Sequence, residues 1–269
     1  MNIYRLELHN IRKSAAVSTL LISVIVIFML AFFPSMQTES MKALTGAKLE
    51  SIDPALLAAL GMSEIMDFTL ITNYFGYVLQ FITLVIMVIV TQQAVSLLIK
   101  EETDGTIEYL CAKPVSRTDI FVQKLLAHLT VFALMSLVFI GVTLAGYLMF
   151  SDFGFVAALK EVLMFFASIF FVGLVFSSIG LLLSALLKSS KGAAGITIAI
   201  VFGTFLLGIL SSLVKELDFL IWFSPLDWIK AKKLMSEGIL LHEWIIGVTV
   251  IFGGTSAAWL RYRKKDLLI

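Results

Sequence analysis

The residues with the clearest chemical potential lie in one short polar segment, from Lys100 to Arg117. This segment is rich in carboxylates and separates two apolar stretches, residues 68–99 and 129–151, that contain no Asp, Glu, Lys, Arg or His. One compact charged element is thus held between two membrane-length apolar stretches, at the expected boundary with water. We interpret the segment as a docking element.

The remaining reactive residues do not form a catalytic or metal-binding pattern. His9, His128 and His242 are too scattered to indicate a metal site, and we interpret them as interface or hydrogen-bonding residues. The single cysteine, Cys111, excludes an intrachain disulfide and a cysteine-based zinc site, and we expect it to pack on a helix face. The sequence has no P-loop pattern. We therefore expect no ATP site, no cofactor and no enzymatic activity on this chain.

Local signals predict a short helix over residues 103–112. Thr103 and Asp104 provide an N-cap oxygen and a first-turn acid. One apolar stripe and one exposed acidic set are expected along it: Ile107, Leu110 and Cys111 in the stripe, and Glu101, Glu102 and Glu108 exposed.

A break and a second helix should follow. Pro114 ends the first helix, and the spacing of Ser116 and Asp119 is typical of a capping box that starts the next one. These residues alone are equally consistent with a simple amphipathic connector.

The composition places the chain among integral membrane proteins. Of 269 residues, 59% are hydrophobic and 14% charged, with a mean hydropathy of +1.00, whereas soluble domains have about 25% charged residues. The net charge of +1 gives no support for nucleic-acid binding.

Six apolar stretches are long enough to cross a bilayer, which takes about 20 residues of helix. We predict an all-α membrane protein, a single transmembrane domain over residues 1–269. A short interfacial helix should lead into the first span, which we expect to be retained rather than cleaved as a signal peptide and to end at Pro34. The predicted spans are residues 15–33, 73–99, 120–150, 162–187, 192–214 and 244–260, the last being the shortest.

Two connections carry further expectations. The link between the fourth and fifth spans, residues 188–191, is so short that we predict an antiparallel helical hairpin. Basic residues near span ends are enriched on the cytoplasmic side. Placing both termini in the cytoplasm puts 13 of the 20 Lys and Arg residues inside, although Lys230, Lys232 and Lys233 then crowd one outer loop.

The outer segments should contain short helices. Asp53 and Pro54 start one over residues 54–60. A second, over residues 225–237 and ended by Gly238, is predicted to lie in the membrane interface beside Trp222 and Trp228.

The middles of the predicted spans lack ionisable residues, which disfavours an ion-coupled carrier. Pairs of small residues four apart permit close helix packing: Gly180 with Ser184, Thr204 with Gly208, and Gly208 with Ser212. Such pairs also arise by chance, so they are equally consistent with no interface.

The polar segment resembles a known signature. Glu101-Glu102-x-x-Gly105-Thr106-Ile107-Glu108-x-Leu110-x-Ala112-x-Pro114-Val115-Ser116-Arg117, with Lys124 following, is similar to the motif of ABC-2 type transporter permeases. The turn around residues 180–194 and the basic-basic-Asp-Leu sequence at residues 264–267 are weaker likenesses. Lys113 and Cys111 depart mildly from the pattern.

The resemblance implies an exporter subunit with six spans, paired with a second permease subunit of the same or a related kind. It also implies a separate ATPase, in two copies, that binds ATP and Mg²⁺ on the cytoplasmic face of a bacterial plasma membrane. Residues 103–112 would be the coupling helix. The residues expected to contact the ATPase are Glu101, Glu102, Gly105, Thr106, Ile107, Glu108, Leu110, Pro114 and Arg117.

Two other functional classes stay open on the sequence. One is an ATP-independent carrier, and the other is a membrane scaffold or immunity-type protein that transports nothing. The substrate, the identity of the ATPase and the choice between a homodimer and a heterodimer do not follow from these residues.

Overall fold

The described part of the chain is helical, without strands. The computed structural model describes residues 3–39, 67–106, 115–187, 189–190 and 192–265. Its helices are α1 (Ile3–Met36), α4 (Ile71–Thr103), α6 (Arg117–Phe150), α7 (Phe155–Leu186), α8 (Ala193–Leu213), the 3₁₀ helix η2 (Lys215–Phe223), α9 (Pro225–Trp228), α10 (Ala231–Ser236) and α11 (Leu241–Lys264). Six of them are long and apolar enough to span a membrane, as predicted.

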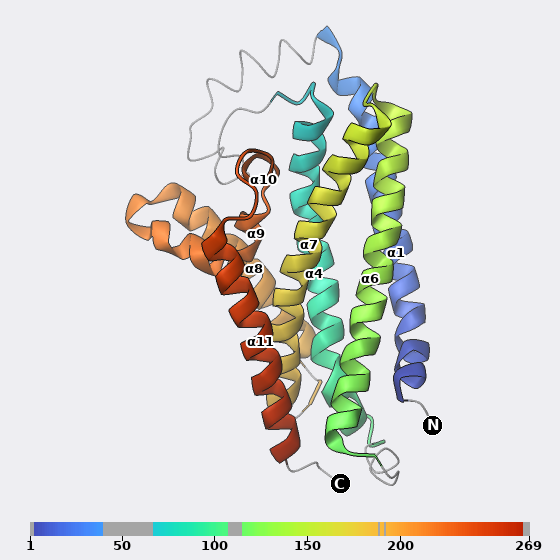
Figure 1. Cartoon of the computed structure of the whole chain (residues 1–269), viewed down its shortest axis with the longest axis vertical. Coiled ribbons are helices and arrows are strands. Elements are labelled where there is room, and N and C mark those ends of the chain that lie inside the picture. The colour runs from blue at the N-terminus through green and yellow to red at the C-terminus, as the bar shows by residue number, and fades with distance from the viewer. Residues whose placement is uncertain (1–2, 40–66, 107–114, 188, 191, 266–269) are drawn as a thin grey trace.

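The start of α1 and the end of α11 lie at the same end of the bundle (Figure 1). We call this the N/C end, and the other the opposite end. The end of α4, the start of α6 and the end of α7 also lie at the N/C end (Figure 1). An even number of crossing helices produces this arrangement, which agrees with the predicted span count.

The core lies between α4 and α7. Within the most apolar 18-residue stretch of α4 and of α7, 67% of the residues are buried. The corresponding fraction is 28% in α1 and 17% in α11. Phe75 and Met87 of α4 and Val172 and Phe176 of α7 are fully buried. α1 packs on α6, and α11 packs on α7. The outer helices expose large apolar side chains, an arrangement that suits lipid or another protein better than water.

Close packing of α4 on α7 depends on a small residue. A Cβ atom at Gly180 would lie 2.8 Å from both the Thr91 carbonyl oxygen and the Ala94 Cβ. One turn later, Ser184 Oγ accepts a hydrogen bond of 2.9 Å from the backbone N–H of Leu98. The predicted Gly180–Ser184 pair therefore marks a real helix interface. Gly208 instead packs against Ser224 and Asp227, beside α9.

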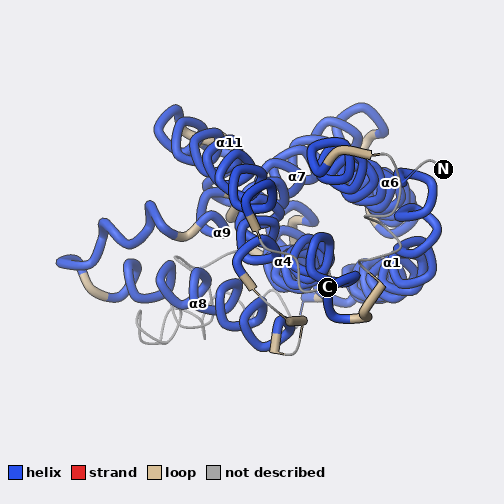
Figure 2. The backbone as a smooth tube through the Cα atoms, turned by 90° about the horizontal axis from the view of Figure 1, so that it is seen from below, coloured by secondary structure: helices blue, strands red, loops and turns tan. Residues whose placement is uncertain are grey.

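Several local predictions about helix ends were wrong. α1 runs without a break from Ile3, and Pro34 lies inside its last turn instead of ending it. The shortest of the six long helices is α8, not α11. Among the long helices, α8 packs on α4 and lies apart from α7 (Figure 2), so the short link does not produce a packed hairpin. Link length limits where a helix starts, while side-chain packing decides which neighbour it contacts.

The predicted interfacial helix over residues 225–237 is two short helices. All four residues of α9 are buried, including Trp228, so this piece packs against other helices inside the bundle. Gly238 follows α10 with a φ of +69°, consistent with its predicted role as a stop. The helix predicted over residues 54–60 falls outside the described residues.

Candidate functional site

The last turn of α4 ends where the predicted docking element begins. Thr103 is the last residue of α4, and its Oγ1 donates to the Ile99 carbonyl at 3.0 Å. The Thr106 N–H then bonds to the Glu101 carbonyl at 2.9 Å across Gly105, whose φ is +67°. This closure is typical of a glycine C-cap, in which the left-handed conformation favours glycine. Thr103 and Asp104 therefore end a helix rather than starting one.

A buried ion-pair cluster joins this turn to α1 and α6. Lys124 of α6 is 1% exposed, and its Nζ lies 2.6 Å from the Leu97 carbonyl, 2.5 Å from Glu101 Oε1 and 3.6 Å from Glu7 Oε2. The ammonium group has three N–H donors, so these three oxygens match its donor capacity. A lysine can be buried in an apolar bundle only when such partners surround it.

A second ion pair joins the same turn to the end of α11. The Glu102 side chain is 1% exposed, and its Oε1 lies 2.9 Å from Lys265 Nζ. Lys265 also donates to the Leu187 carbonyl, just after α7, at 2.8 Å. Glu101 and Glu102 were predicted to be exposed. They are enclosed instead, because basic residues far away in sequence fold against them.

Arg117 caps the end of α11. This residue begins α6, and its guanidinium group donates to the carbonyls of Arg263 at 3.2 Å and Lys265 at 2.6 Å. A cation at a helix C-terminus stabilises the unsatisfied carbonyls there. The predicted capping box is confirmed, since Ser116 and Asp119 bond reciprocally at 3.1 and 3.2 Å.

Four elements therefore meet at the last turn of α4, directly or through Lys124 and Lys265: α1, α6, the α7–α8 link and the end of α11. The contact with the link is the N–H of Ser190, which donates to Thr103 Oγ1 at 3.0 Å. Among the predicted contact residues, Glu101, Glu102, Gly105, Thr106 and Arg117 are gathered here. Ile107, Glu108, Leu110 and Pro114 fall outside the described residues.

A polar crevice opens beside this turn, between α1 and α4. Its volume is about 340 Å³, and its walls include Asn10 and Ser14 of α1 with Gln92, Gln93 and Ser96 of α4. Within the described residues, the amide oxygens of both glutamines have no hydrogen-bond partner. Amide groups left without partners in an apolar bundle are costly, so the crevice suits water or a polar solute.

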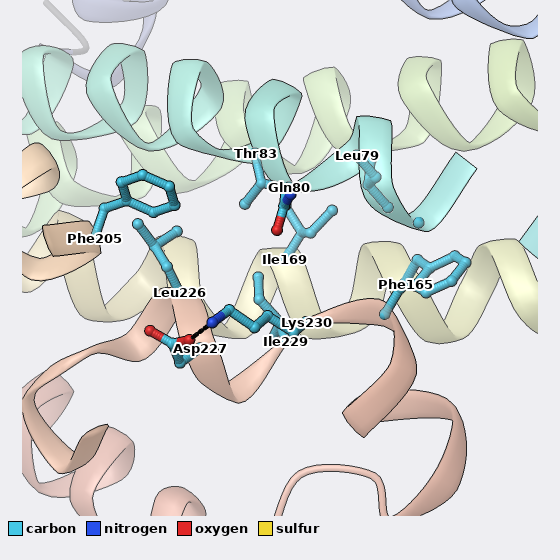
Figure 3. A pocket seen from close by; sticks show the side chains of 12 residues that line it. Leu79, Gln80, Thr83, Phe165, Ile169, Phe205, Leu226, Asp227, Ile229 and Lys230 are labelled. Carbon is cyan, nitrogen blue, oxygen red and sulfur yellow. Dashed lines mark ion pairs between the residues drawn. The ribbon is translucent and has the colours of Figure 1, made fainter. Parts of the chain in front are cut away.

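A smaller cavity lies between α4, α7 and α9, and Gln80, Phe165 and Leu226 are among the residues that line it (Figure 3). Its volume of about 20 Å³ holds a single water at most. Asp227 forms an ion pair with Lys230 beside it (Figure 3), and its Oδ2 accepts from Ser224 Oγ at 2.5 Å. The cavity is too small for a substrate.

Sequence reasoning missed the buried acids that pair across elements. Glu7 pairs with Lys124, and Glu243 pairs with Lys233. Glu161 accepts hydrogen bonds of 2.8 Å from Tyr147 and Thr72. The available signal was a lone acid on an otherwise apolar helix, because such a residue needs a partner.

The described residues hold no group of three or more His, Cys, Asp or Glu that could bind a metal. His128 is fully buried, and its Nε2 lies 2.9 Å from Ser177 Oγ. His242 stacks on Trp222. Both contacts agree with the expected structural roles for these histidines.

The comparison that decides the family is a match over residues 1–236 to the ABC-2 family transporter proteins. The chain belongs to the ABC-2 transporter family. No curated protein matches the chain. Family membership and the six apolar helices together identify a multi-pass membrane protein and a permease-type component of a transporter. Members of this family are membrane transport components rather than catalysts.

Proposed function

We propose that this ABC-2 protein is the permease subunit of an ATP-driven exporter and receives the motion of a separate ATPase through residues 103–114. The observation that carries the proposal is the convergence of α1, α6 and α11 on the last turn of α4. Glu101 and Glu102 bind Lys124 and Lys265 there. A rigid-body displacement of this turn is transmitted to every helix that is ion-paired with it.

The proposed roles divide the motif into two parts. Glu101, Glu102 and Arg117 transmit motion inside the permease, because each is already bound to another helix. Glu108, Ile107 and Leu110 form the contact with the ATPase, which holds ATP and Mg²⁺. Two permease chains and two ATPase chains form the transporter, and the polar crevice beside Gln92 and Gln93 belongs to the substrate path.

The N/C end faces the cytoplasm of a bacterial plasma membrane in this proposal. The support is the sequence, in which 13 of the 20 Lys and Arg residues belong to the segments predicted to be inside, as the positive-inside rule favours.

The test is co-purification from the native membrane with Glu108→Lys and a matched control. Charge reversal at Glu108 should lower recovery of a P-loop ATPase by about tenfold, the effect of one charge-assisted contact of about 1.4 kcal/mol. Glu237→Lys, at an exposed acid directly after α10, should leave recovery unchanged.

Purification of an active chain without any ATPase would instead indicate an ATP-independent carrier. Equal loss of ATPase in both variants would indicate misfolding rather than a lost contact, and wild-type recovery of the ATPase with Glu108→Lys would contradict the assigned role of Glu108.

A further inference from the structure

α1 and α6 enclose a large groove that the proposed coupling does not use. Its volume is about 860 Å³, and its lining runs along α1 from Arg5 to Ile27 and along α6 from Val131 to Val142. At about 1.5 Å per residue, the part of the α1 wall from Ala15 to Ile27 is about 18 Å long, close to the depth of one leaflet of a bilayer core that is about 30 Å thick.

The lining is chemically divided along its length. Beyond Arg12 it is almost entirely aliphatic, with Leu20 and Val24 of α1 facing the groove together with Leu134 and Val138 of α6. All four are exposed, Leu20 at 66% and Val24 at 56%. An exposed apolar surface of this extent suits hydrocarbon chains.

The charged side chains that line the groove are Arg5 and Arg12, and both lie at the N/C end. His9 lines it between them, and the spacing of four and three residues places all three on one face of α1. They precede the predicted span that begins at residue 15, so they lie at the depth of lipid headgroups.

The two arginines have no hydrogen-bond or ion-pair partner among the described residues. Three other basic residues near this end do have such partners: Lys124 and Lys265 in ion pairs, and Arg117 with the α11 carbonyls. Two adjacent guanidinium groups without a counter-charge favour an anionic ligand, for which they present paired N–H donors.

We infer that the α1–α6 groove binds an anionic phospholipid of the surrounding leaflet, with its phosphate at Arg5 and Arg12 and its acyl chains along Leu20, Val24, Leu134 and Val138. Basic pockets between membrane helices bind anionic headgroups in this way. The apolar face of a second copy would fill the aliphatic part and leave both arginines unpaired. A zwitterionic lipid would carry no net charge to offset them.

The test is native mass spectrometry of the purified full chain, titrated with phosphatidylglycerol or phosphatidylcholine in mild detergent. The wild type should bind one phosphatidylglycerol about 25-fold more tightly than phosphatidylcholine, as expected for two arginines that contribute about 1 kcal/mol each. Arg5→Ala with Arg12→Ala should reduce this preference to below about twofold, and Arg5→Lys with Arg12→Lys should retain most of it.

Two further variants separate the groove from general surface charge. Lys13→Ala removes an exposed cation outside the groove lining and should keep the preference. Ala16→Trp, at an exposed groove position, should weaken the binding of both lipids, because the indole ring would fill the space of the acyl chains.

Three results would overturn the inference. They are equal wild-type binding of the two lipids, loss of the preference in Lys13→Ala, and disulfide crosslinking of two copies through Leu134→Cys in a Cys111→Ser background. The inference requires only that the chain spans a membrane, so it can succeed or fail independently of the proposed ATPase coupling.

Discussion

Lys124 is the residue whose environment most constrains this end of the molecule. It is 1% exposed and contacts Glu7 and Glu101 from two other helices. Burying a charge is unfavourable unless the whole set is paired, so removal of one member costs more than the pair contributes. The cluster therefore acts as a unit that fixes the relative positions of α1, α4 and α6.

Lys124→Met should lower the free energy of unfolding by about 3 kcal/mol or more, since Glu7 and Glu101 would lose their counter-charge. Thermal unfolding followed by helical circular dichroism in detergent measures the loss. Adding Glu7→Gln and Glu101→Gln should recover most of it. A change below about 1 kcal/mol in Lys124→Met would show that the cluster contributes little.

The pair of Glu102 and Lys265 allows a charge-exchange experiment. Glu102→Lys places two cations together and should reduce the yield of folded protein, while Glu102→Lys with Lys265→Glu should restore it, because the attraction is re-formed with reversed polarity. Size-exclusion chromatography of detergent extracts gives the folded fraction. If the folded fraction of the double variant is no higher than that of Glu102→Lys alone, the ion pair does not contribute to folding.

At the scale of elements, the α4–α7 contact holds the core, and its closeness depends on Gly180. Substituting Gly180→Val would force side-chain atoms into the Thr91 carbonyl and Ala94. Overpacking of this kind costs about 1–3 kcal/mol. Gly203→Val in α8 is the matched control, because nothing lies within 4 Å of a Cβ at that position.

Melting temperatures of the two glycine variants test this interpretation. Gly180→Val should unfold at a lower temperature than the wild type, and Gly203→Val should remain close to it. Equal melting temperatures for the two variants would mean that α4 and α7 can move apart without a loss of stability.

The positions of helix ends were the hardest feature to predict from local sequence patterns. Ser116 starts α6 as its capping box predicted, because both partners of that motif are local. Thr103 and Asp104 offered similar oxygens but lie where α4 ends, since the apolar face of α4 continues to pack through Leu98 and Ile99. Local cap chemistry is outweighed when tertiary contacts extend the preceding helix.

At the scale of the whole molecule, the distribution of basic residues follows from pairing as well as topology. Lys230 and Lys233 crowd the segment predicted to lie outside, but they form ion pairs with Asp227 and Glu243. Their charge is therefore offset by buried acids.

Cysteine labelling tests the orientation directly. In a Cys111→Ser background, Lys232→Cys should react with a membrane-impermeant maleimide added outside intact cells, and Lys113→Cys should react only after permeabilisation. The opposite pattern would invert the proposed topology.

The sequence by itself determined the class of the protein, its six apolar helices and the position of the motif, because hydropathy and span length are sums over neighbouring residues. Only the tertiary structure decided that Glu101 and Glu102 are enclosed, that α8 packs on α4 rather than α7, and that α9 lies in the core. The partners responsible, such as Glu7 and Lys265, are separated from these residues by long stretches of chain. Whether a charge faces water or another helix depends on those distant partners, so no local pattern can reveal it.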